Sequence, residues 1–561
     1  MARELNWFFR PMVWFLCSMI FVGAAILIVF QGDRTEDLPQ AEALKDEEEE
    51  IAWVYPATNA QTWERFVESI FQAVEHCRQK YPSMKVDAEN RIHPASQKVP
   101  QVSISFIHPD LLTESKLIFR WYKLTSEWTP TRWIQHLVSL PRPPKAIIAG
   151  SNSSWAHKFA SELQKQASAE AIRKPPLLFL TTATADQVFH AGNEPAGNTP
   201  QGPQFNPSWE DDSSRIDLND LYSGRTFRFC FTNRQIANRI SRFVWSRVEL
   251  RPESDPAILV NWMDDEYSRD LSKAFAGEFD HRALENHVDQ WGFLSGVIGL
   301  GLPPAAVIGR YSSGFRHDVS IQLAVDSSVG SFAFPNSYEA KAVQDLVSQL
   351  PSIPQRSLLV LTGQQQPCRR FLRDLARSSP SDSRKFLVLM GDTLSLNAIL
   401  RDRRITWPIQ DLPFPAVAFA HRNPVDTQSG FNFSGKESTR LEETDPSSTD
   451  DLLLYRDIVE ACVLSRLNQL STPSTSEEWI HLLDRICFHD QHLNLDEMGR
   501  RLFSKNGKRA SGSGEHLLYV RPEAETDRIY PRAIIEVWRV DELNRFKLVG
   551  SPMRVPFNEF E

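Results

Sequence analysis

Short apolar segments alternate with segments of helical periodicity along most of this chain. Ile51–Tyr55 has the composition of a buried strand, and Thr62–Gln79 carries its apolar residues on one helical face. The later predicted strands are Ala146–Gly150, Leu177–Leu180, Thr226–Phe231, Ala257–Trp262, Ser357–Leu361 and Phe386–Met390, and the later predicted helices are Trp155–Lys165, Gln235–Val248, Tyr267–Phe279 and Arg369–Arg377. Regular alternation of strand and helix predicts βαβ units and an α/β fold with mostly parallel sheets.

Four polar stretches interrupt this alternation. Ala191–Arg215, Asp426–Asp450 and Lys505–Gly514 are rich in small and polar residues, which is typical of surface loops. Residues 32–50 end in the acidic run Asp46–Glu50. Because like charges repel one another, we expect residues 32–50 to form an extended, solvated linker; an acidic metal site is the alternative.

The segment before this linker is apolar and uncharged. Residues 11–31 are long enough to cross the hydrocarbon core of a bilayer, which is roughly 30 Å thick. Arg3 and Arg10 precede the segment, whereas the flank after it is acidic. This bias predicts a cytoplasmic tail (1–10), one transmembrane helix and a large extracytoplasmic, periplasmic-side ectodomain. A cleaved signal peptide is the alternative, but its apolar region would be shorter and followed by a small-residue cleavage site.

Length, charge and cysteine content narrow the class of protein. A chain of 561 residues exceeds what one core usually contains, so two or three structural units are expected. A formal net charge of −9 argues against a nucleic-acid partner, which needs a basic face. The six cysteines are widely spaced and form no CxxC pair, so we expect buried free thiols. A single bridge, such as Cys462 to Cys487, is the alternative.

Several runs of sequence, taken in order, resemble one family. IAWVYPATNAQTWERF is similar to its first strand, binding turn and helix, and AIIAGSNSSWAHKFA to a later strand, G-x-x-S turn and helix. LLFLTTATADQV is similar to the next strand, and AILVNWMDDEYSRDLSKAF to the first strand and helix of a second lobe. FLVLMGDT is similar to the strand that returns to the first lobe, and Leu453–Leu464 to a late first-lobe helix. These are features of the type I periplasmic binding proteins, and the resemblance covers roughly Ile51–Val540.

The resemblance implies a two-lobe α/β fold that closes on a small ligand. The first lobe would contain residues 51–235 and 385–500, and the second lobe residues 236–384 and 501–561. The chain departs from the family in three ways: its loops at Ala191 and Asp426 are longer, Ser268 stands where many members have Gly, and a membrane span precedes the lobes. These departures argue against a classical transport role more than they argue against the fold.

Candidate ligand residues follow from the strand ends, because ligands of parallel sheets bind there. Ser153 and Ser154 begin a helix whose free N–H groups suit a carboxylate, although either serine could simply cap that helix. Thr182 and Thr184, which follow the next strand together with Thr181, offer hydroxyls or ordinary turn chemistry.

The second lobe contributes two further candidates. Tyr267 follows Asp264 and Asp265 at a helix start and could cover a ligand when the lobes close, whereas the two acids are ordinary partners of the helix dipole. Asp392, after Gly391, could bind the ammonium of a zwitterionic ligand; otherwise, if it is buried, it needs an Arg or solvent as its partner.

Motifs for catalysis, cofactors or metals do not emerge from the sequence. GxxxxGK[ST] and GxGxxG are absent, and Gly512-Ser513-Gly514 lacks nucleophile-elbow spacing. His489 and His492 could contact a metal but lack a carboxylate at motif spacing, so we interpret them as surface residues.

The sequence therefore predicts a membrane-tethered, non-enzymatic solute-binding domain without a cofactor. By resemblance the small polar ligand would be an amino acid, and any signal would pass through a membrane partner protein. An interaction protein that kept the fold and lost the pocket is the main alternative, and an enzyme on an α/β scaffold is the second.

Overall fold

The computed structural model describes part of the chain: residues 41–56, 61–78, 81–88, 98–107, 114–169, 175–189, 215–250, 257–262, 265–279, 315–321, 343, 357–378, 386–393, 414–421, 448–468, 475–484, 516–522, 533–540, 546–549 and 553–554. Several predictions lie outside these residues: the tail and transmembrane segment (1–31), the start of the linker, most of the three loops, Asp264, Cys487, His489 and His492. Within the described residues, no helix is long and apolar enough to cross a bilayer.

The first lobe is built on a seven-stranded sheet. Its strand order is β2 (Lys85–Ala88), β3 (Gln101–Ile107), β4 (Glu114–Leu124), β1 (Glu48–Pro56), β5 (Ala146–Ala149), β6 (Leu177–Leu180) and β9 (Thr226–Arg228). The strands from β4 to β9 in this order are parallel, and β2 and β3 join them as an antiparallel edge. All residues of β5 and β6 are buried, which explains their continuous apolar sequence.

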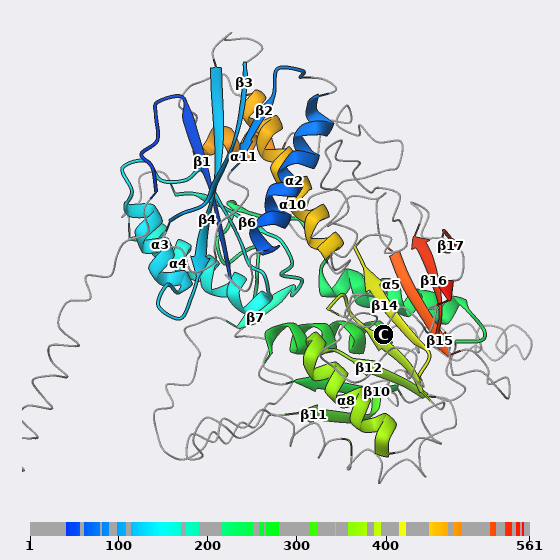
Figure 1. The fold of residues 1–561 in the computed structure, drawn as a ribbon. Helices are drawn as coiled ribbons and strands as arrows, with labels where there is room; N and C mark the ends of the chain where they lie inside the picture. The colour runs from blue at the N-terminus through cyan, green and yellow to red at the C-terminus, as the bar shows by residue number, and fades with distance from the viewer. Residues whose placement is uncertain are drawn as a thin grey trace, which may run out of the picture.

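Helices cover both faces of this sheet. On one face α2 (Gln61–Arg78) packs with α10 (Ser448–Leu467) and α11 (Ser476–Asp484), around a core that includes Trp53 and Phe66. On the other face lie α3 (Pro130–Ser139) and α4 (Ser153–Ser168). Figure 1 shows α10, in orange, beside α2, in blue, although most of the chain separates them in sequence. The expectation that the segment around Leu453–Leu464 is a first-lobe helix is therefore confirmed.

The second lobe is built on a larger mixed sheet. Its order is β11 (Phe315–Ile321), β10 (Ala257–Trp262), β12 (Ser357–Leu361), β13 (Phe386–Met390), β14 (Ala416–Ala420), β15 (His516–Pro522), β16 (Ala533–Val540) and β17 (Phe546–Leu548), with β18 (Met553–Arg554) also on β16. The strands from β11 to β14 are parallel and the C-terminal strands are antiparallel. α8 (Gln365–Ser378) covers one face; α5 (Asn233–Ser246) and the helix at 266–279 cover the other.

The prediction of an α/β fold with mostly parallel sheets is confirmed, but the predicted lobe boundaries need one correction. β13, the FLVLMGDT segment, pairs with β12 and β14 in the second sheet and does not return to the first lobe. The chain returns instead between β14 and α10. The physical reason is that an apolar strand pattern reports burial and carries no information about which sheet supplies the neighbouring strands.

The acidic run Asp46–Glu50 also differs from the prediction. β1 begins at Glu48, and the side chains of Glu48, Glu49 and Glu50 are nearly buried, so they do not belong to a solvated linker. Cations from segments that pack beside β1 neutralise them. Arg120 lies 2.7 Å from Glu50, and Lys116 lies 3.5 Å from Glu48. Glu49 has two partners, Lys145 at 3.5 Å and Arg466 at 3.4 Å. Pairing with opposite charge removes the repulsion on which the prediction rested.

The described cysteines agree with the expectation of free thiols. Cys77, Cys230, Cys368 and Cys462 are buried thiols that form no disulfide bond, so Cys462 does not take part in the alternative bridge to Cys487. A separate two-stranded antiparallel sheet, formed by β7 (Gln187–Phe189) and β8 (Arg215–Asp217), lies at the lobe junction.

Candidate functional site

The strand ends of the first lobe are held together by the predicted serine and threonine side chains. Asn152 caps α4, since its side chain accepts a hydrogen bond from Trp155 N at 2.8 Å; neither Ser153 nor Ser154 is the cap. The hydroxyl of Ser153 instead accepts from Ala185 N at 3.1 Å, and Ser154 is half-buried. The capping role that the sequence left open for the two serines therefore belongs to their neighbour.

The threonines after β6 make similar local contacts. Thr182 donates its hydroxyl to Ser151 O at 2.8 Å, and Thr181 donates to Gly150 O. Thr184 is fully buried, and its hydroxyl has no partner among the described residues. Its carbonyl accepts from Asn233 N at 2.7 Å, which connects this turn to the start of α5 in the second lobe.

Tyr267 and Asp392, the two second-lobe candidates, bind each other. The Tyr267 hydroxyl donates to Asp392 Oδ1 at 2.9 Å, and His421 Nε2 lies 3.1 Å from Oδ2 of the same carboxylate. Burial and the nearby carboxylate raise the pKa of Tyr267 well above its ordinary value, which keeps the hydroxyl a donor. His421, at the end of β14, is thus the partner that a buried Asp392 requires.

The predicted residues therefore form two groups, one on each lobe. Asn233 links them, because its amide donates to the Tyr267 carbonyl at 3.3 Å while its backbone donates to Thr184. In this conformation the hydroxyls of Ser153, Thr182 and Tyr267 and both oxygens of Asp392 are engaged within the protein.

A buried carboxylate joins the lobes directly. Asp270, in the helix at 266–279, accepts hydrogen bonds from Asp186 N at 2.8 Å and Gln187 N at 3.0 Å, both in the first lobe. Asn233 donates to the same carboxylate at 3.0 Å. In return the Asp186 carboxylate accepts from Arg234 N at 2.9 Å, at the start of α5. We call this reciprocal arrangement of Asp186 and Asp270 the clasp; a second contact pairs His157 with Glu266 at 3.2 Å.

The clasp changes the acidity of Asp270. Burial is the main cause, and the neighbouring Asp186 charge adds to it; together they raise the pKa of Asp270 to about 7 against the opposing hydrogen bonds. Burial likewise raises the pKa of Asp265 to about 6 and raises the pKa of Asp217.

We expect a pH dependence of stability that is specific to Asp270. The carboxyl group of Asp270 holds its proton more tightly in the folded protein than in the unfolded chain, where an Asp has a pKa of about 3.9. The contribution of Asp270 to the free energy of unfolding therefore falls as pH rises between about 4 and 7. The free energy of unfolding of the wild type relative to Asp270→Asn, which does not titrate, should therefore increase as pH is lowered from about 8 to about 5. Urea unfolding of both proteins across that range measures it, and a constant difference would contradict the assignment.

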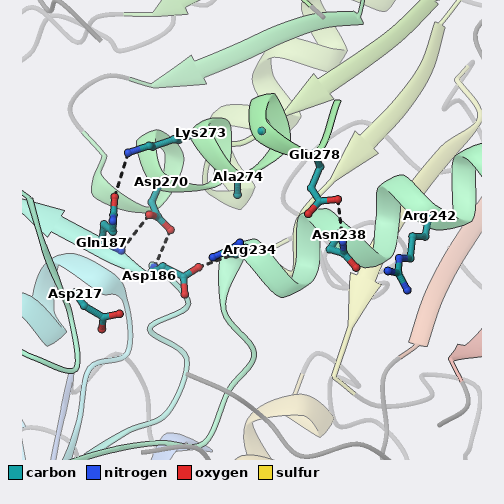
Figure 2. Close-up of a pocket in the computed structure, with 11 residues that line it drawn as sticks. Asp186, Gln187, Asp217, Arg234, Asn238, Arg242, Asp270, Lys273, Ala274 and Glu278 are labelled. Carbon is teal, nitrogen blue, oxygen red and sulfur yellow. Dashed lines mark hydrogen bonds between the residues drawn. The ribbon is translucent and has the colours of Figure 1, made fainter. Parts of the chain in front are cut away.

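A cavity of about 600 Å³ lies beside the clasp. Figure 2 shows its lining residues on the segment at Asp186, on β8, on the helix α5 and on the helix at 266–279. The lining is Asp186, Gln187 and Asp217 from the first lobe, and Arg234, Asn238, Arg242, Asp270, Lys273, Ala274, Gly277 and Glu278 from the second. Both lobes therefore contribute polar groups to one concave surface, and its cationic side chains come from the second lobe.

Sequence reasoning did not identify these cavity residues. Arg234, Asn238 and Arg242 form a polar stripe at helical spacing opposite the apolar face of α5, and Asp270 and Glu278 stand eight residues apart on the helix at 266–279. Such stripes are the usual solvated face of a helix, so nothing in them signals a site. Among the described residues no group of His, Cys, Asp and Glu is arranged to hold a metal ion.

Comparison with known proteins gives structural likenesses only. No family model and no curated protein matches the chain. An ABC transporter substrate-binding protein from Desulfitobacterium hafniense is 13% identical, with 90% of this chain and 100% of that chain covered and a TM-score of 0.46. A branched-chain amino acid ABC transporter periplasmic ligand-binding protein from Burkholderia xenovorans is 11% identical (90% and 94% covered, TM-score 0.43), and an extracellular ligand-binding receptor from Verminephrobacter eiseniae is 9% identical (89% and 99%, 0.43).

Proposed function

We propose that this chain is a non-enzymatic solute-binding protein of the type I periplasmic-binding-protein kind, which binds a small polar ligand between its two lobes. The observation that carries this proposal is the cavity beside the clasp, because residues of both lobes line it. A ligand in contact with both lobes binds the closed arrangement better than an open one and so shifts the population toward closure.

The ligand class follows from the lining and from the sequence resemblance. Charged groups of both signs surround the cavity, which suits a small polar molecule; an amino acid is the class that the resemblance implies. We propose that Ser153, Ser154, Thr182, Thr184, Tyr267 and Asp392 form the adjoining cleft wall, to which Asn233 connects the clasp.

The membrane tether is part of the same proposal. Residues 11–31 are apolar and uncharged and follow two arginines, which supports a single helix with a cytoplasmic N-terminus and an extracytoplasmic ectodomain. We propose that ligand binding reaches the cell through a membrane partner protein.

Gly277 offers a direct test of the cavity. A Cβ built at Gly277 has no atom within 4 Å, so a side chain attached there starts in open space. We expect the phenyl ring of Gly277→Phe to occupy part of the cavity and abolish ligand binding while the protein stays folded. Thermal unfolding of the full-length chain against amino acids and small polar metabolites measures binding, because a ligand of the folded state raises Tm with the logarithm of its concentration.

Gly277→Ala is the matched control. It also replaces the glycine inside this helix, where alanine gains about 1 kcal/mol of helix propensity, and it leaves most of the cavity open. A saturating increase in Tm that survives in Gly277→Ala and disappears in Gly277→Phe supports the proposal. No increase across the panel would instead favour an interaction protein that uses the same fold without a small ligand.

A further inference from the structure

The carboxylates that line the cavity already have donors within the protein. Asp270 accepts three hydrogen bonds, two of them from the first lobe, and Asp186 accepts from Arg234 N. Asp217 Oδ1 accepts from Asn219 N at 2.8 Å, and Glu278 Oε2 accepts from Asn238 at 2.8 Å. A cationic ligand would therefore meet acceptors that are partly or fully used.

The two guanidinium groups of the lining are in the opposite situation. In the part of the chain that the structure describes, the side chains of Arg234 and Arg242 have no hydrogen-bond or ion-pair partner, although both line the cavity. They stand on one stripe of α5 with Asn238 between them, at a spacing of about 12 Å along the helix axis at 1.5 Å per residue. Figure 2 shows this stripe opposite the helix that carries Asp270 and Glu278.

A guanidinium is a planar set of donors that pairs with a carboxylate through two parallel hydrogen bonds. Arg234 and Arg242 place two guanidinium groups on one wall of the cavity, and their long side chains let the two groups approach each other. Such a pair suits a ligand that carries two carboxylates on one short carbon chain. Asp270 opposes such a ligand less than a fully ionised carboxylate would, because its raised pKa leaves it partly protonated near neutral pH.

We infer that the ligand of this cavity is a small organic dicarboxylate held by Arg234 and Arg242. The inference rests on the proposed function, since it names the ligand class for the same cavity.

The test compares probes of similar length and different charge on the full-length protein. Succinate and glutarate carry two carboxylates, putrescine carries two ammonium groups on a four-carbon chain, and leucine is a neutral zwitterion. We expect calorimetric titration to show binding of succinate or glutarate and not of putrescine or leucine. Arg242→Ala and Arg234→Ala should each weaken that binding by about 10- to 100-fold, as expected when a charged hydrogen-bond partner is removed. Lys165→Ala is the control, because it removes one positive charge from an exposed site on α4 and should leave the affinity unchanged.

The possible results separate the two proposals. Binding of leucine or putrescine without binding of either dicarboxylate overturns the dicarboxylate inference and leaves the solute-binding proposal standing. Dicarboxylate binding that is equally strong in the two arginine variants also overturns it, because the anion would then bind elsewhere. If none of the probes and no member of the broader panel binds, both proposals fail together.

Discussion

Replacing Asp270 with alanine is expected to separate the two lobes. The change removes the acceptor of Asp186 N, Gln187 N and the Asn233 amide, which are the hydrogen bonds of the clasp. Each buried polar group that loses its partner costs about 1–3 kcal/mol unless it reaches water, and opening the lobes is the movement that lets water in. We therefore expect lower stability to urea, a larger radius of gyration by small-angle X-ray scattering, and loss of ligand-induced compaction.

Asp270→Asn is the graded control for this prediction. The amide keeps one acceptor oxygen and nearly the same volume, so its effects should be smaller than those of alanine. It also removes the charge that lies near Asp186, which should offset part of the lost hydrogen bonding. An unchanged radius of gyration and unchanged urea midpoint in Asp270→Ala would show that the clasp does not hold the lobes together.

Glu50→Ala is expected to cause the largest loss of stability in the first lobe. The Glu50 carboxylate is buried between Arg120, at 2.7 Å, and the hydroxyl of Tyr122, at 2.6 Å. Alanine would leave the buried guanidinium without its closest counter-charge, and breaking a buried pair in this way costs about 3–5 kcal/mol. Urea unfolding followed by tryptophan fluorescence reports on this lobe, because Trp53, Trp63 and Trp121 pack together in its core.

An exposed ion pair on the same lobe provides the comparison. Glu75 lies 3.0 Å from Arg78 on α2, but its side chain is 68% exposed. Glu75→Ala should therefore change stability by no more than about 1 kcal/mol, since solvent screens such pairs. If the two variants were equally stable, the buried acidic start of β1 would not have the structural role that its contacts indicate.

Local patterns in the sequence determined much of the fold. Continuous apolar runs such as Ile147–Ala149 and one-sided apolar faces such as that of α2 depend on neighbours a few residues away, so they predicted strands, helices and the α/β class. The same patterns placed Ser153, Thr182 and Asp392 at strand ends, because a strand end is also a local feature. The edge strand β2 was not predicted, since it has only four residues and a half-exposed sequence.

Only the tertiary structure decided what those residues contact. β13 joins the second sheet through pairing with β12 and β14, and Glu49 is neutralised by Arg466, which lies more than four hundred residues further along the chain. Asp392 bonds Tyr267 and His421, and Asp270 meets the backbone of Asp186 across the lobe junction. The sequence carries periodicity and burial in short windows, whereas charge compensation, sheet membership and a cavity shared by two lobes depend on distances between segments that no window contains.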